Sequence, residues 1–205
     1  MEISPSSVRD LREKTGAGMM DCKKALVETG GDFEKAVEYL RKKGIASASK
    51  KAGRLTKEGS VTSYIHGEGR VGVMVEINCE TDFVARTEKF REFTKDVAMH
   101  IAAVSPRWVR PEEVPTDLIA KEKEIASAQM QASGKPANVI EKIVEGKIGK
   151  FYEESCLLNQ SFVKDPSKTI DQLTKEAIAS LGENISIRRF ARFALGEGVE
   201  ATTQE

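Results

Sequence analysis

In residues 71–79, VGVMVEINC, apolar side chains recur at every second position. A period of two places alternate side chains on opposite faces of a strand, so this stretch predicts a β-strand with one buried face. A second such run, Val61 to Ile65, precedes it across a glycine-containing loop of hairpin length at residues 66–70. The two runs therefore predict an antiparallel hairpin near the middle of the chain.

The residues around this hairpin predict the rest of a sheet domain. A helix is expected to open near Thr87, because apolar residues then recur at spacings of three and four, which would cover the sheet. These residues are Phe90, Phe93, Val97, Ile101 and Val104. Alternation returns in residues 185–195, which predicts a third strand with one apolar side. That side is formed by Ile185, Ile187, Ala191, Phe193 and Leu195.

The first 45 residues predict a compact bundle of three short helices. Ser4 and Pro5 combine an N-cap with a proline at the first helical position, which opens the first helix. The second helix is predicted from about Met19 to Glu28. Asp32 caps the third, and we expect Lys42-Lys43-Gly44 to end it.

A pair of helices is predicted between the sheet helix and the last strand. Residues 116–132 and 139–151 have helical periodicity, and the break at 133–136 is so short that the helices must run antiparallel. Their apolar stripes are narrow, so we expect this hairpin to project from the body. Asp165-Pro166 then precedes a further helix that Gly182 ends. The chain as a whole is predicted to be α+β, with a three-stranded antiparallel sheet packed by helices.

Composition excludes several classes of protein. The 205 residues carry 32 basic and 32 acidic side chains, so the chain lacks the overall positive charge of most dedicated nucleic-acid binders. Neither a signal sequence nor a run of about 20 apolar residues is present, so we expect a cytoplasmic protein without a membrane partner. The cysteines Cys22, Cys79 and Cys156 lie too far apart for a metal-ligand motif, and buried reduced thiols are expected.

Residues that support catalysis are scarce. The two histidines are His66, in the hairpin loop, and His100, in the predicted sheet helix, where a packed imidazole is favoured over a general base. Gly67 and Gly69 are not followed by a helix, so they form a turn and not a phosphate-binding loop. We therefore expect no catalytic residue, no metal ligand, no cofactor and no direct nucleotide binding.

Two basic stretches leave an RNA-binding alternative open. Seven basic residues and no acid lie between Arg41 and Lys57, which fits either a phosphate-contacting patch or a solvated helical or flexible linker. Arg188, Arg189 and Arg192 alternate with aromatic residues in the last strand, as in some RNA-binding sheets. The glycine-rich ribonucleoprotein signature is missing, which favours an exposed strand face, so nucleic acid is not the expected partner.

The segment Thr81-Asp82-Phe83-Val84 stands out because it directly follows the buried strand. A strand end can hold a carboxylate and an aromatic ring rigidly, with Phe83 as an apolar wedge and Asp82 as a charge that disturbs a partner's cation site. Alternatively, Thr81 caps a helix and Phe83 lies under the sheet. The residues alone do not decide between these two interpretations.

Two long motifs in this chain closely resemble the signatures of bacterial elongation factor Ts. They are TGAGMMDCKKAL at residues 15–26 and NCETDFVAR at residues 78–86. Shorter matches follow in order, namely KFYEE at 150–154, QSFVKD at 160–165 and GENISIRRF at 182–190. The resemblance covers nearly the whole chain, and several irregular motifs in the right order are far more specific than a single glycine pattern.

The resemblance implies a guanine-nucleotide exchange factor that binds elongation factor Tu. It implies a ubiquitin-associated-like three-helix domain with the basic linker at residues 1–55, and a core or dimerisation domain at 56–205 with a protruding helical hairpin at about 113–155. It places Thr81, Asp82, Phe83 and Val84 at the partner's Mg²⁺ and nucleotide site. Contacts of the N-terminal domain are expected from Leu11, Gly16, Met19 and Met20, although one of the two methionines is expected in the core.

Longer members of the family look internally duplicated, whereas this chain has a single hairpin in its core. A single copy leaves one face or edge of the sheet uncovered. We therefore predict a homodimer, in which a second subunit supplies the missing cover.

Overall fold

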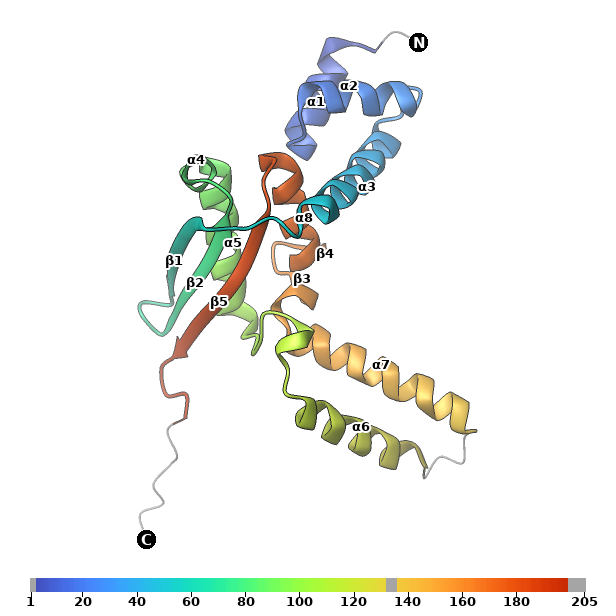
Figure 1. The fold of residues 1–205 in the computed structure, drawn as a ribbon, viewed down its shortest axis with the longest axis vertical. Coiled ribbons are helices and arrows are strands. Elements are labelled where there is room, and N and C mark those ends of the chain that lie inside the picture. Colours follow the sequence, from blue (N-terminus) through green and yellow to red (C-terminus); the bar gives the residue numbers. More distant parts are fainter. Residues whose placement is uncertain (1–2, 132–135, 199–205) are drawn as a thin grey trace. The chain divides into compact units, whose positions relative to one another are not determined.

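The computed structural model describes residues 3–131 and 136–198 (Figure 1). The chain divides into two compact units, each assembled from several segments. The first unit comprises Met1–Val61, Glu76–Thr94 and Gln172–Ile187. The second comprises Thr62–Val75, Lys95–Asp171 and Arg188–Glu205. Helices and an antiparallel sheet make up the chain, which confirms the predicted α+β class.

Three helices open the first unit, as predicted. They are α1 (Pro5–Thr15), α2 (Met19–Glu28) and α3 (Phe33–Lys51). The Ser4 hydroxyl caps α1 by accepting a hydrogen bond from the Ser7 amide, and the Asp32 carboxylate caps α3 by accepting one from the Lys35 amide. Buried side chains from all three helices form one small core. Its members are Val8, Leu11, Cys22, Ala25, Leu26, Ala36 and Leu40.

The expected end of the third helix at Gly44 is wrong, because α3 continues to Lys51. Gly44 is a packing residue in the middle of the helix. A Cβ at this position would lie 3.2 Å from the Cβ of Ala179 in α8 (Ile170–Leu181), which is tighter than ordinary van der Waals contact. Glycine therefore lets α3 and α8 approach closely here and does not terminate the helix.

The predicted hairpin forms β1 (Glu58–His66) and β2 (Val71–Cys79), and β5 (Ile185–Ala194) completes the sheet. The strand order is β1-β2-β5, so β2 lies in the centre (Figure 1). Its alternation is confirmed, since Val73, Val75, Ile77 and Cys79 are all buried. The apolar side of β5 is buried only at its start. Ile185 and Ile187 lie in the core, whereas Phe193 and Leu195 are each 73% exposed.

Two helices follow β2, where one was expected near Thr87. They are the short α4 (Asp82–Ala85) and the long α5 (Glu88–Val104). The predicted apolar stripe of α5 is buried at four of its five positions. The exception is Val104, in the last turn of the helix, which is 39% exposed.

The second unit contains α6 (Thr116–Gln131) and α7 (Ala137–Ser155), which lie side by side (Figure 1). The Lys147 ammonium of α7 donates a hydrogen bond to the Gln129 side chain of α6. Pro136 is the N-cap of α7, while the rest of the predicted break, residues 133–135, lies outside the described residues.

A small two-stranded sheet was not predicted. It pairs β3 (Ser161–Phe162) with β4 (Asp165–Thr169), so Asp165 and Pro166 precede a helix as predicted but themselves begin a strand. Such short strands carry too little alternation to be recognised in a sequence. The helix expected after them is α8, and Gly182 ends it with a left-handed φ of 80°.

Candidate functional site

The segment Thr81–Val84 forms a short exposed tip directly after β2. Thr81 is extended and its hydroxyl accepts a hydrogen bond from the Val84 amide, so the expectation that Thr81 caps a helix is confirmed. Phe83 is 79% exposed, which contradicts the alternative in which its ring lies under the sheet. Most of the Phe83 ring is therefore open to solvent, where another molecule can reach it.

The carboxylate of Asp82 is held only by a weak ion pair, which another charged group can replace. Its carboxylate lies 2.9 Å from the Arg86 guanidinium, in an ion pair whose side chains are 44% and 75% exposed. Ion pairs at such exposure contribute at most about 1 kcal/mol, because water screens them. Asp82 therefore keeps its charge at the surface and can release Arg86 when another cation or hydrogen-bond donor approaches.

Cys79, the last residue of β2, holds the backbone of Thr81, the first residue of the tip. This buried residue donates a thiol hydrogen bond to the Thr81 carbonyl oxygen at 3.1 Å. Burial, together with the nearby charge of Glu183, raises the pKa of Cys79 to about 11. The thiol is consequently protonated, and able to donate, throughout the neutral range.

The four residues expected at the N-terminal contact surface have different environments. Leu11 is fully buried in the core of α1–α3, so it can serve a contact only by positioning α1. Gly16 ends α1 in a left-handed conformation with φ of 66°. Met19 and Met20 are 42% and 77% exposed, so the expectation that one of them belongs to the core is wrong. Both lie in the first turn of α2, before its buried residues begin.

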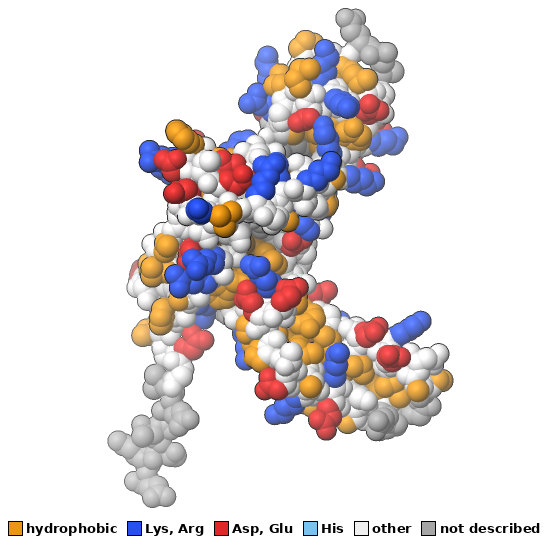
Figure 2. Space-filling view, in the orientation of Figure 1, with side chains coloured by type: hydrophobic (Ala, Val, Ile, Leu, Met, Phe, Trp, Pro, Cys, Tyr) orange, Lys and Arg blue, Asp and Glu red, His pale blue; other side chains and the backbone are white. Residues whose placement is uncertain are grey.

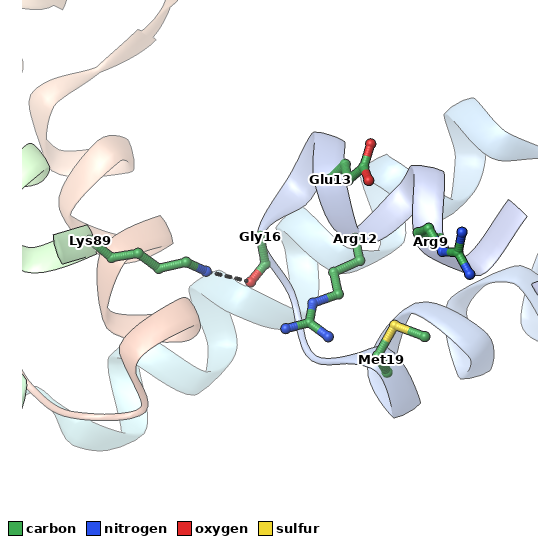
Figure 3. Close-up of a pocket in the computed structure, with 6 residues that line it drawn as sticks. All are labelled: Arg9, Arg12, Glu13, Gly16, Met19 and Lys89. Carbon is green, nitrogen blue, oxygen red and sulfur yellow. Dashed lines mark hydrogen bonds between the residues drawn. The ribbon is translucent and has the colours of Figure 1, made fainter. Parts of the chain in front are cut away.

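A cleft of about 490 Å³ brings Gly16 and Met19 together with charged residues that the sequence did not single out (Figure 3). The other lining residues are Arg9, Arg12, Glu13 and Lys89. Lys89, from α5, donates a hydrogen bond to the Gly16 carbonyl oxygen at 3.3 Å. Three cations against one carboxylate make the cleft positive. Spacing along α1 could have suggested Arg9 and Arg12, but Lys89 reaches the cleft only through the fold.

His100 is a structural residue and is fully buried. Its Nδ1 accepts a hydrogen bond from the Val163 amide at 3.3 Å, so the ring proton lies on Nε2, which contacts Gln160 Oε1 at 3.1 Å. Burial lowers the pKa of His100, partly opposed by the bond to Gln160. Both ring nitrogens are thus in use, and the packed-imidazole interpretation is the correct one.

Much of the charge in the basic stretch 41–57 is already satisfied. The segment is helical as far as Lys51. Lys42, Lys43 and Arg54 form ion pairs with Glu38, Asp21 and Glu80. Arg41 and Lys51 donate hydrogen bonds to Gln172 and to the Ile178 carbonyl oxygen. Five of the seven basic side chains are thus bonded within the chain, which is the arrangement expected of a connector.

Residues 3–131 and 136–198 contain neither a candidate metal centre nor a candidate membrane-spanning helix. Within them, no three His, Cys, Asp or Glu side chains converge in a way that could hold a metal ion. No helix in the same ranges has the length and apolar character needed to cross a membrane.

Comparison with known proteins identifies relatives along the whole chain. A family model described as Elongation factor TS matches residues 19–197. Elongation factor Ts of Geobacter sulfurreducens is 63% identical over 200 residues, which cover 98% of this chain and 93% of the relative. Elongation factor Ts of Caldanaerobacter subterraneus subsp. tengcongensis is 60% identical over 198 residues, covering 97% and 99%. The chain belongs to the elongation factor Ts family.

Proposed function

We propose that this translation elongation factor, whose family exchanges guanine nucleotide on elongation factor Tu, acts through the exposed tip Thr81–Val84. The observation that carries the proposal is the exposure of Phe83 beside the weakly held carboxylate of Asp82. A ring that is 79% exposed has most of its apolar area still to bury, so it gains free energy by entering a pocket of the partner.

The mechanism is a coupling between two binding equilibria. A factor that binds elongation factor Tu more tightly without Mg²⁺ and GDP must, by linkage, weaken the binding of GDP by the same ratio. Phe83 would wedge into the partner, and Asp82 would compete for the groups that hold the cation and the phosphates. GDP then leaves and GTP can bind. No covalent bond is made or broken, so the chain needs no catalytic residue or cofactor.

The N-terminal helices supply a second contact in this proposal. We assign residues 1–55 to a ubiquitin-associated-like domain with its basic linker, which docks on the nucleotide domain of the partner. The exposed methionines Met19 and Met20 and the positive cleft beside Gly16 support this assignment, because they offer apolar and cationic contacts on one small surface. Leu11 would act by holding α1 in place.

Residues 56–205 form the core and dimerisation domain in the same proposal, with α6 and α7 as a projecting helical hairpin at about 113–155. A homodimer is supported by four exposed apolar side chains in the sheet strands or directly after β5, namely Ile65, Met74, Phe193 and Leu195. Each of these side chains is more than half exposed, and Figure 2 shows hydrophobic side chains at the surface over the strands.

Because elongation factor Tu acts in translation, the cytoplasm is the expected location of this chain.

Release of labelled GDP from elongation factor Tu tests the proposal. The chain should accelerate release strongly, and Phe83→Ala should lose part of that acceleration. Burial of the ring is worth on the order of 2 kcal/mol, which corresponds to about a 30-fold loss. Val61→Ala is a matched control, because Val61 is a large apolar side chain at 61% exposure that lies outside the tip and outside residues 1–55. Equal rates for wild type and Phe83→Ala would refute the role of the tip.

A further inference from the structure

We propose that Glu183 is a positioning residue for nucleotide exchange, which fastens the base of the tip so that Phe83 and Asp82 are presented in one fixed geometry. The inference rests on the proposed function of Thr81–Val84. It concerns a residue that belongs to none of the expected contact surfaces and lies 102 positions from Thr81 in the chain.

Glu183 receives three hydrogen bonds from the last two residues before α4. Its Oε2 accepts from the Glu80 amide at 3.1 Å and from the Thr81 amide at 3.0 Å. Its Oε1 accepts from the Thr81 hydroxyl at 2.6 Å. Bonds to an ionised carboxylate are shorter and stronger than bonds between neutral groups, so this side chain clamps the end of β2.

A reciprocal set of bonds braces the same place from the other side. The Glu80 carboxylate accepts from the Asn184 amide at 2.6 Å and from the Arg54 guanidinium at 3.5 Å. The Asn184 side-chain amide donates to the Arg54 carbonyl oxygen at 2.8 Å. The end of β2, the start of β5 and the segment before β1 are thereby tied together directly beneath the tip.

The position of the tip depends on these bonds, because a four-residue helix with no buried side chain is not fixed by its own packing. Helix α4 has only four residues and none of them is buried. Thr81, by contrast, has its amide and hydroxyl bonded to Glu183, and its carbonyl oxygen accepts from the Cys79 thiol and the Ala85 amide. Because no side chain of α4 is fully buried, the bonds at Thr81 contribute much of what fixes the position of this helix. Without these bonds the tip would become ordered only on contact with the partner. The free-energy cost of that ordering would reduce what the insertion of Phe83 contributes to nucleotide release.

The test measures GDP release from elongation factor Tu as a function of the concentration of this chain. Glu183→Ala removes all three acceptor bonds, whereas Glu183→Gln keeps the shape and one acceptor oxygen. We expect the maximal release rate to fall about tenfold for Glu183→Ala and about threefold for Glu183→Gln. The half-saturating concentration should change less than twofold, because the N-terminal contact is untouched.

A double variant separates positioning from a general loss of structure. If Glu183 acts through the tip, adding Glu183→Ala to Phe83→Ala should slow release less than twofold further. If the two effects multiply, or if Glu183→Ala alone leaves the maximal rate within twofold of wild type, the inference is overturned. Glu88→Ala, an exposed acid in the first turn of α5, controls for loss of a negative charge near the tip. An equal effect there also overturns the inference.

Failure of the proposed function has a different signature. If Phe83→Ala itself leaves the maximal rate unchanged, the tip is not the site of action, whatever Glu183 does. Circular dichroism shows whether Glu183→Ala folds. If it does not, the isosteric Glu183→Gln replaces it in the same test. Glu183→Gln should then lower the maximal release rate about threefold, and this loss should be absent in the Phe83→Ala background.

Discussion

Buried cysteine residues give this chain a thiol chemistry that can be predicted residue by residue. Burial raises the pKa of Cys79 and of Cys156 to about 11, and nearby acids add to the shift in each case. Burial likewise raises the pKa of Cys22. Only the thiolate reacts with disulfide reagents or alkylating agents, and at pH 8 about one thiol in a thousand is ionised at a pKa near 11.

We therefore expect the native chain to react with a disulfide reagent at pH 8 over hours and not over seconds. All three thiols should react at once after unfolding in denaturant, and absorbance of the released chromophore measures both rates. Rapid modification of Cys79 in the native chain would show that the base of the tip opens, against the tight bonding described for Thr81.

His100 predicts a loss of stability in mild acid. Burial places the pKa of His100 in the folded chain below its ordinary value of 6.5, so the unfolded chain binds the proton more readily. Stability is fully present above pH 6.5 and declines as pH falls below it, until the lower folded pKa is reached. The slope for one proton is at most about 1.4 kcal/mol per pH unit.

Urea unfolding followed by circular dichroism between pH 7.5 and 5 measures this dependence. His100→Gln removes the titrating group, so its stability should fall less steeply over the same range, even if it is lower throughout. An equal slope in the variant would mean that protonation of His100 does not drive the acid instability and that carboxylates account for it.

Among the elements, the β1–β2 hairpin depends on one glycine and tolerates a change at another. Gly59 has a φ of 141°, and a Cβ there would lie 2.1 Å from the Ile77 carbonyl oxygen and 2.7 Å from the Asn78 Cα. Backbone atoms cannot yield by that much. A Cβ at Gly72 would meet only the end of the Ile65 side chain at 3.3 Å, which can move.

Gly59→Ala should therefore destabilise the hairpin by several kcal/mol, whereas Gly72→Ala should change it by about 1 kcal/mol or less. Amide hydrogen exchange of peptides that cover β1 and β2 gives the opening free energy of this element in each variant. Comparable protection in the two variants would contradict the close approach of the strands at Gly59.

Sequence patterns identified long elements better than short ones. Helix α2 begins and ends where its motif predicted, and β2 follows its alternation over nine residues. Strand β3 has two residues, so no period can be read from it, and α3 passes through Gly44 because a neighbouring helix rewards a small residue there. For α3 the deciding contact is with Ala179, which is distant in the chain, whereas β3 pairs with the nearby β4.

For the whole molecule, the exposed apolar side chains in and beside the sheet strands predict self-association. Phe193 and Leu195 expose nearly three quarters of their surface, and a second copy of the chain is the partner proposed to cover them. Phe193→Lys should weaken the dimer by about 2 kcal/mol, or about 30-fold in Kd, because the charge cannot be buried without a counter-ion. Sedimentation velocity or light scattering across a concentration series measures the change.

Met20→Lys offers the contrasting control, since Met20 is equally exposed but lies on the N-terminal helices. Its mass distribution should match that of wild type. A wild-type chain that is monomeric at micromolar concentration would contradict the homodimer without touching the exchange mechanism, which uses the tip.

Local periodicity and motifs contiguous in the chain were enough to predict the long helices and strands, the family and the position of the tip. Whether Phe83 is bare or buried, and whether Met19 and Met20 are free, was decided only by tertiary structure. The exposure of a side chain depends on which residues pack against it, and these are often distant in the chain. The clamp from Glu183 to Thr81 is the same kind of fact, since 102 residues separate the two groups and only folding joins them.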